Sequence, residues 1–222
     1  MRYLFVLVLL SSVISLTAQL PILEQYAYGG EGSVSIRRII PAADGGAYIV
    51  GGSSIQTNTG NLSVERKGSL ACLVAKLDVN LNIEWANTYG GSQSESGAQI
   101  LKVEDGLLVL SSTTSVVSID KTAPLHGDFD VWLFKLDFEG NLIWQKSFGG
   151  VDYDMPTDMV RMNNGNVLIA VNSESSISGN RTVDRKGVSD IWLICTDVDG
   201  EVVWQGSYGG EQRENPRSML HL

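Results

Sequence analysis

Short apolar segments alternate with polar turns along the whole chain after its first twenty residues. Between residues 148 and 208, four such segments are rich in β-branched and large apolar side chains and are bounded by Gly, Asn, Asp or Ser. This composition and punctuation are typical of β-strands, and no useful length of helical periodicity interrupts them. We predict strands over 158–162, 167–171, 191–196 and 201–208.

The third predicted strand of a unit is apolar at successive positions rather than at alternate ones. Residues 131–134 and 191–194 contain no polar side chain. Successive residues of a strand point to opposite faces of the sheet, so such a strand needs cover on both faces. The pattern therefore predicts four-stranded sheets that stack face to face.

An aromatic residue followed by two glycines marks a repeat of about sixty residues. It occurs at Tyr28, Tyr89, Phe148 and Tyr208, at intervals of 61, 59 and 60 residues. We predict units over 28–88, 89–147 and 148–207 and a partial unit over 208–222, within a repeat domain that spans 22–222. A tryptophan precedes three of the aromatic residues by four positions, and an aspartate precedes each tryptophan by seven (Trp85, Trp144, Trp204; Asp78, Asp137, Asp197).

The repeated tryptophans have two interpretations. Each lies two residues from an apolar side chain on the same strand face (Ile83, Leu142, Val202), which favours packing in the core. Burial of roughly 200 Å² of aromatic surface stabilises a fold by several kcal/mol, at about 25 cal/mol per Å². The alternative is that the rings are platforms on which sugars stack.

The last two strands of a unit are joined by a tight turn of the form Asp-x-x-Gly. It occupies 137–140 in the second unit and 197–200 in the third, where the glycine supplies the positive φ that such hairpins need. The first unit has Leu81 in place of the glycine. Its turn is therefore either strained, or Asn80 or Asn82 takes the left-handed position.

Three stretches carry a resemblance to a known class of protein: 45–53 (GGAYIVGGS), 130–137 (DVWLFKLD) and 140–150 (GNLIWQKSFGG). In these motifs the chain resembles secreted bacterial β-propeller repeat proteins, whose blades of about sixty residues contain W-x3-[YF]GG and are similar to quinone-enzyme and kelch-like blades. The resemblance covers residues 22–215. It implies an all-β fold in which repeated four-stranded antiparallel sheets are propeller blades.

About three blades plus partial ones make an incomplete ring, since closed propellers need at least about four. The resemblance therefore implies either a fragment of a longer protein or self-association that completes the ring.

The N-terminus has the layout of a secretory signal peptide. Arg2 is followed by an apolar run over 4–10 and then by small and polar residues that end at Ala18 and Gln19. We predict a signal peptide over 1–18 and a secreted or cell-surface protein. The apolar run is shorter than the roughly twenty residues of a membrane span, so no membrane insertion is expected.

The net charge limits the classes of partner that we expect, and the positions of the two cysteines argue against a disulfide. The formal net charge is −9, and an acidic surface disfavours nucleic acid and anionic lipid. Cys72 and Cys195 occupy different repeat positions in the first and third units, too far apart for a disulfide. We expect two buried thiols.

An acidic residue follows the aromatic residue by six positions at Glu95, Asp154 and Glu214. These are the candidate metal ligands, because converging carboxylates could hold a divalent cation such as calcium. The alternative, which we favour, is that each carboxylate accepts hydrogen bonds from the backbone of its Gly-Gly turn. No other cofactor is expected.

The polar loops over 54–68, 113–127 and 174–187 differ from copy to copy. Variable loops on a rigid scaffold commonly carry binding residues. The candidate binding residues are Asn58, Asn61, Asp120, His126, Asn180 and Asp184.

These features lead us to expect a noncatalytic module that binds a glycan or protein ligand at the cell surface. The chain contains two histidines, His126 and His221, and no catalytic set can be assembled from them. One alternative is a structural spacer in a larger surface protein. Another is a fragment of a quinone-type or hydrolytic propeller enzyme.

Overall fold

A computed structural model describes residues 27–55 and 60–220. Within these residues the chain forms three four-stranded antiparallel sheets and no helix, and each sheet takes its strands in sequence order. The all-β prediction is confirmed. The same part of the chain contains no helix long and apolar enough to cross a membrane. The predicted signal peptide lies outside the described residues.

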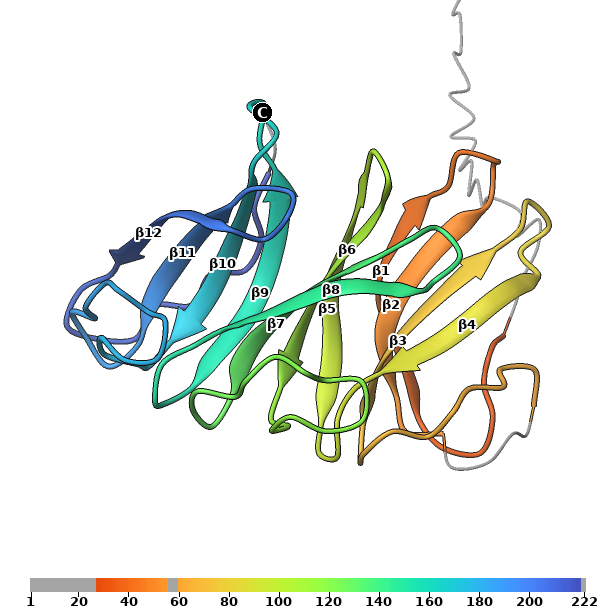
Figure 1. Ribbon diagram of the computed structural model, residues 1–222, viewed down its shortest axis with the longest axis horizontal. Helices are drawn as coiled ribbons and strands as arrows, with labels where there is room; N and C mark the ends of the chain where they lie inside the picture. Colours follow the sequence, from red (N-terminus) through yellow and green to blue (C-terminus); the bar gives the residue numbers. More distant parts are fainter. Residues whose placement is uncertain (1–26, 56–59, 221–222) are drawn as a thin grey trace, which may run out of the picture.

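The sheets follow one another across the molecule, from orange and yellow through green to blue (Figure 1). The first sheet consists of β1 (Val34–Pro41), β2 (Ala47–Ser53), β3 (Ala71–Leu77) and β4 (Ile83–Tyr89). The second consists of β5 (Glu95–Val103), β6 (Gly106–Thr113), β7 (Asp130–Leu136) and β8 (Leu142–Phe148). The third consists of β9 (Asp154–Arg161), β10 (Val167–Ser173), β11 (Asp190–Thr196) and β12 (Val202–Tyr208).

The four strands predicted in the third unit agree with β9 to β12 within two residues, except at the start of β9. That strand begins at Asp154, four residues before the predicted start. Its first residues pair with the end of β10, and a register shift beside Ala170 skips Thr157. The polar start of the strand is stable because the Asp154 carboxylate accepts a hydrogen bond from Ser175 at 2.7 Å.

The second sheet is covered on both faces, which confirms the stacking predicted from the apolar third strands. One face packs on the first sheet in a cluster that includes Trp132, Phe134 and Leu136. The opposite face packs on the third sheet through a cluster that includes Leu133 and Val131. Alternate residues of β7 therefore belong to two different cores.

The same backbone link recurs where one sheet leads to the next. The residue that begins β5 or β9 donates its N–H to a carbonyl just before the third strand of the preceding sheet, from Glu95 to Leu70 and from Asp154 to Phe129, both at 2.8 Å. Glu214 makes the equivalent bond to Ser189 at 3.0 Å. The repeat therefore extends through residue 214 in its backbone contacts.

The Asp-x-x-Gly hairpins adopt the predicted left-handed conformation. Gly140 and Gly200 have φ angles of 85° and 76°, and Leu81 has a φ of 61° in the first unit. The strained alternative is therefore correct for Leu81, and neither Asn80 nor Asn82 has a positive φ. A leucine in this region costs about 1–2 kcal/mol relative to the right-handed conformation.

Two of the three repeated tryptophans pack against the hairpin of the following sheet. A β-carbon at Gly140 would lie 3.0 Å from the Trp85 ring, and one at Gly200 would lie 2.8 Å from the Trp144 ring. Core packing is therefore confirmed for Trp85 and Trp144. Trp204 is 39% exposed, so the prediction is wrong for this third tryptophan, which no described sheet covers.

Both cysteines are free and buried, as predicted. Burial raises the pKa of the Cys72 thiol to about 12. The thiol of Cys72 is therefore protonated at neutral pH and unsuited to nucleophilic chemistry.

Candidate functional site

A groove opens at each of the two junctions between neighbouring sheets. The first groove, between the first and second sheets, has a volume of about 290 Å³. The second groove, between the second and third sheets, has a volume of about 650 Å³. The first is lined by Glu65, Lys67, Asn87, Thr88, Tyr89, Asp120, Gly140, Asn141 and Leu142. The second is lined by Thr122, Ala123, Pro124, His126, Gln145, Lys146, Ser147, Phe148, Asn180, Gly200, Glu201 and Val202.

The two grooves occupy equivalent positions of the repeat. The fourth strand of one sheet, the following long loop and the last hairpin of the next sheet contribute to both. Of the nine residues that line the first groove, only Gly140 has the same residue, Gly200, at the equivalent position of the second. The exchanges include Lys67 for His126, Tyr89 for Phe148, and Asp120 for Asn180. The backbone framework is therefore shared, while the chemistry of the lining is specific to each junction.

The first groove is occupied by its own side chains. Lys67 Nζ lies 2.6 Å from the Asp120 carboxylate and donates a hydrogen bond of 2.8 Å to the Thr88 carbonyl. The Tyr89 hydroxyl donates to the Gly140 carbonyl at 2.5 Å. An ion pair and a phenol therefore narrow the groove at this junction.

The second groove lacks these groups and is correspondingly larger. Phe148 has no hydroxyl to donate to the Gly200 carbonyl, and Asn180 carries no charge to pair with a cation. Lys146 and Glu201 form an ion pair across the groove, with 28% and 74% of their side chains exposed. The groove therefore has an apolar and amide lining beneath one solvent-accessible ion pair.

His126 lies in the second groove as an uncharged side chain. Burial lowers its pKa, and the nearby Lys121 cation lowers it further. Its Nε2 atom is buried without a hydrogen-bond partner. The imidazole is therefore neutral at pH 7, and the lining carries no histidine charge that could attract an anion.

Three of the predicted binding residues make hydrogen bonds within the fold, and two of them, Asp120 and Asn180, link neighbouring sheets. Asn61 and Asn180 each accept a hydrogen bond from the first glycine of an aromatic-Gly-Gly segment, at Gly29 and Gly149, both at 3.0 Å. Their amide nitrogens donate to the carbonyls of Ala27 and Ser147, which come directly before these segments, at 2.7 Å. Asp120 takes the equivalent position and accepts from Gly90 at 3.4 Å.

The remaining predicted binding residues are separated from these. Asp184 is exposed in its loop and accepts a hydrogen bond from the backbone of Arg185 at 3.0 Å. Asn58 lies outside the described residues. The structure therefore brings His126 and Asn180 together in the second groove, places Asp120 in the first, and leaves Asp184 apart from both.

Two of the three candidate metal ligands, Glu95 and Asp154, lie at the two junctions between sheets, and Glu214 lies at the equivalent place after the third sheet. The buried Glu95 carboxylate accepts a hydrogen bond from Gly91 N at 2.9 Å, and the buried Asp154 carboxylate accepts one from Gly150 N at 2.7 Å. These are the Gly-Gly contacts that we favoured. Across residues 27–55 and 60–220, no group of three or more His, Cys, Asp and Glu side chains could hold a metal ion.

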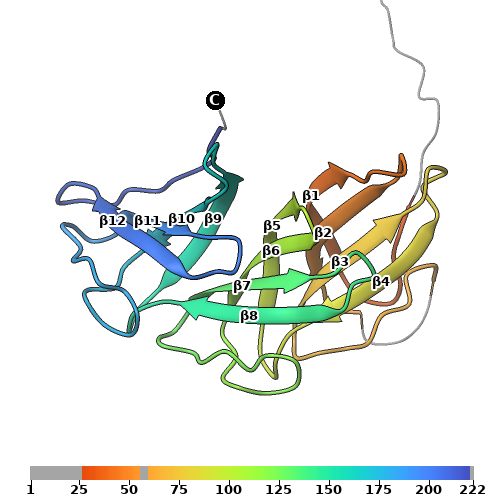
Figure 2. The same ribbon diagram turned by 45° about the horizontal axis from the view of Figure 1, so that its top comes forward.

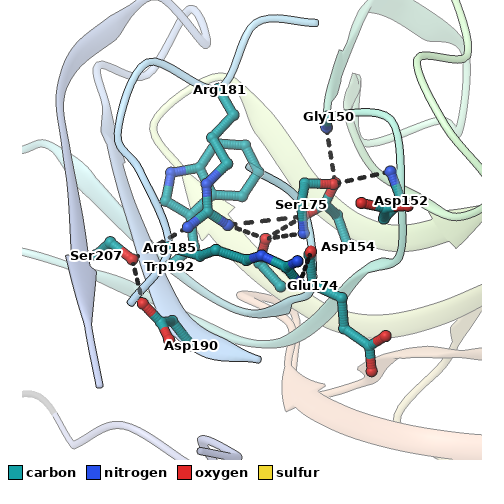
Figure 3. A network of polar contacts seen from close by, with 12 residues as sticks. Gly150, Asp152, Asp154, Glu174, Ser175, Arg181, Arg185, Asp190, Trp192 and Ser207 are labelled. Carbon is teal, nitrogen blue, oxygen red and sulfur yellow. Dashed lines mark hydrogen bonds and ion pairs between the residues drawn. The ribbon is translucent and has the colours of Figure 1, made fainter. Parts of the chain in front are cut away.

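Two buried cations were missed from the sequence. Lys121 is fully buried and Arg181 is 1% exposed. Figure 3 shows the Arg181 guanidinium over the Trp192 ring, at 5.2 Å from the ring centre, with a hydrogen bond of 3.0 Å to Ser207. Arg181 also lies 3.9 Å from the Asp154 carboxylate.

A repeated pair of opposite charges in the sequence could have identified these buried cations. Lys121 and Arg181 are sixty residues apart, as are the buried acids Asp130 and Asp190. Only the second and third units have both charges.

Comparison with known proteins adds no relationship: no protein-family model matches the chain, and no curated protein matches it.

Proposed function

We propose that this chain is an exported, noncatalytic β-propeller repeat module that binds a glycan or protein ligand at a cell surface. In this proposal the three sheets are propeller blades. The recurring backbone bonds between successive sheets and the packing of Trp85 and Trp144 on the next hairpin support such an arrangement. Export is proposed from the signal-peptide pattern of residues 1–18.

The contrast between the two grooves carries the binding proposal. The framework is constant, but a Lys67–Asp120 ion pair narrows the first groove to about 290 Å³, while the second has about 650 Å³. A volume of about 650 Å³ falls within the range of roughly 300–1,000 Å³ that is usual for small-molecule pockets. The second groove is therefore the proposed ligand site.

The chemistry of the second groove favours a glycan. Lys146 offers a donor and Glu201 an acceptor at the rim, while Pro124 and Val202 add apolar surface. Hydroxyl groups of a sugar can use both polar groups, and the apolar face of its ring can lie on the rest. The neutral His126 leaves no excess positive charge for an anionic ligand.

A glycan array tests this proposal with two pairs of variants. We expect Lys146→Ala and Glu201→Ala to weaken glycan binding at least tenfold. The equivalent positions of the first groove, Asn87→Ala and Asn141→Ala, serve as matched controls and should bind as the wild type does. Unfolding midpoints of all four variants separate lost contacts from lost structure.

A structural spacer is the second candidate function. It is favoured by the use of Asn61, Asp120 and Asn180 within the fold, since these loop side chains accept hydrogen bonds from the backbone of the aromatic-Gly-Gly segments. No retained glycan or protein, together with normal folding of every variant, would support the spacer. Binding that is equally insensitive to variants of both grooves would contradict the assignment of the site.

A further inference from the structure

The outer face of the third sheet carries apolar side chains that no described element covers. Tyr208 is 52% exposed, whereas its equivalents Tyr89 and Phe148 are 5% and 3% exposed. Trp204, four residues earlier on the same strand and face, is 39% exposed. Figure 2 shows β12 of this sheet at the end of the row of sheets. We call this surface the terminal face.

The other two junctions show which element covers an equivalent face. The hairpin between the third and fourth strands of the following sheet lies against the tryptophan, whose ring occupies the space where the hairpin glycine has no side chain. Trp85 also donates a hydrogen bond of 3.2 Å from Nε1 to the Phe138 carbonyl of that hairpin. The terminal face therefore presents the apolar side chains that contact the next hairpin at the other junctions.

Glu214 supplies the polar half of the same junction. Its backbone N–H already bonds to Ser189 O, as Glu95 and Asp154 bond at the other junctions. However, Glu214 Oε2 is buried without a hydrogen-bond partner. Glu95 accepts a hydrogen bond of 2.9 Å from Thr113, and Asp154 accepts one of 2.7 Å from Ser175, both near the end of the second strand of the sheet that the acid begins.

We propose that the terminal face and Glu214 bind a further four-stranded sheet of this same repeat. That sheet carries glycine in the hairpin that meets Trp204, and serine or threonine at the end of its second strand. The glycine makes room for the indole, and the hydroxyl satisfies the buried Glu214 oxygen. This inference concerns the scaffold and holds whether or not the grooves bind a glycan.

The first sheet of a second copy does not fit this description. Its hairpin has Leu81 at the position that Gly140 takes in the second sheet. Even a β-carbon at Gly140 would lie 3.0 Å from the Trp85 ring, so the larger side chain of Leu81 would clash with Trp204. In addition, Ile49 and Leu77 on the corresponding face are only 3% and 4% exposed. The partner is therefore a sheet other than the first one of this chain.

Extension of the full chain by one unit tests the proposal. A copy of residues 155–214 is joined directly after Glu214, so that the copies of Ser175 and Gly200 meet the terminal face. Tyr208→Cys in the original unit introduces a thiol whose labelling rate reports exposure, since Cys72 and Cys195 are buried. We expect labelling to slow at least tenfold in the extended chain relative to the chain of natural length.

The matched control replaces the glycine that copies Gly200 by leucine, the residue found at position 81. Labelling in this control should return towards the rate of the unextended chain. Labelling that is unchanged by the extension, whether the appended unit folds or not, overturns the proposal. It is also overturned if the unextended chain dimerises in sedimentation and the thiol at position 208 becomes protected as the concentration rises.

Discussion

Individual glycines in this fold are required for two separable reasons, conformation and space. Gly140 has a φ of 85°, and a β-carbon there would lie 2.9 Å from Asn87 Nδ2 and 3.0 Å from the Trp85 ring. Gly165 has a φ of 89° and no atom within 4 Å of its virtual β-carbon. The pair therefore separates backbone strain from crowding.

We predict that Gly140→Ala lowers the free energy of unfolding by about 2–4 kcal/mol, since left-handed strain of about 1–2 kcal/mol adds to crowding of similar size. Gly165→Ala should cost only the strain. Urea denaturation of both variants measures the difference. Equal losses would show that the indole does not press on the hairpin.

The equivalent buried acids Asp130 and Asp190 have pKa values shifted in opposite directions. Burial raises the pKa of Asp130 to about 6 and outweighs the hydrogen bonds from His126 N and Gly127 N. At Asp190, burial also acts upward, but hydrogen bonds from Lys186 N and Ser207 Oγ lower the pKa below its ordinary value. The two residues should therefore give opposite pH dependences of stability.

Between pH 4 and pH 6 the folded state holds a proton on Asp130 that the unfolded state has released, so acidification favours folding. We predict that from pH 7 to pH 5 the free energy of unfolding of the wild type rises relative to that of Asp130→Asn. Asp190 behaves oppositely: its contribution is present above its unfolded pKa and is lost as the pH falls through the lowered folded value. From pH 5 to pH 3 the wild type should fall relative to Asp190→Asn.

Urea titrations at the three pH values measure these differences, in which the other titrating groups cancel. If the free energy of unfolding of the wild type fell relative to that of Asp130→Asn from pH 7 to pH 5, the result would contradict the role of burial at Asp130.

At the scale of strands and hairpins, one hydroxyl distinguishes the two junctions. The Tyr89 hydroxyl at the end of β4 donates to the Gly140 carbonyl in the next sheet, and Phe148 at the end of β8 has no such group. Both rings are buried. The chain therefore contains a natural comparison of the same junction with and without this bond.

We predict that Tyr89→Phe lowers the free energy of unfolding by about 1–2 kcal/mol, because it removes the hydroxyl from a buried carbonyl. Phe148→Tyr should raise it by up to about 1 kcal/mol, since the second groove has space beside the Gly200 carbonyl. Thermal and urea unfolding of the reciprocal variants tests both. Destabilisation by Phe148→Tyr would mean that the groove cannot hold the hydroxyl.

The contribution of each repeated tryptophan to the free energy of unfolding should increase with the burial of its side chain. Trp144 packs on the hairpin of the third sheet, whereas no hairpin among the described residues lies against Trp204. We predict a loss of about 3 kcal/mol for Trp144→Ala and about 1 kcal/mol for Trp204→Ala, since the cost of truncation depends on burial. Equal losses in a denaturant titration would contradict this difference.

The strands were predictable because local composition defines them, and their exceptions have local causes. β10 to β12 are apolar and end at turn residues, so their bounds followed from the sequence. The predicted start of β9 was too late because aspartate is not a typical strand residue. Asp154 is stabilised in the strand by a hydrogen bond from Ser175, which lies twenty-one positions later in the chain. Contacts distant in sequence therefore decide where this strand begins.

At the scale of the whole molecule, the scaffold was more predictable than the candidate site. The spacing of Glu95 and Asp154 from the glycines correctly indicated backbone hydrogen bonds. The amide of Asn61 gave no such indication, because its partner Gly29 lies thirty-two positions earlier in the chain. The second groove is larger because Phe148 lacks the hydroxyl of Tyr89 and Asn180 lacks the negative charge of Asp120. The effect of these differences on the groove is visible only when the two junctions are compared in three dimensions.

The same arrangement predicts how stability is distributed along the row of sheets. The second sheet shares apolar cores with both neighbours, while the third has one face covered and one exposed. In a repeat array each unit draws stability from its interfaces, so the middle unit should open least often. We predict that native-state hydrogen exchange is slowest in β6 and β7 and faster in β11 and β12. Uniform protection would indicate a single cooperative unit, whereas faster exchange in β7 than in β11 would show that interfaces between sheets do not determine local stability.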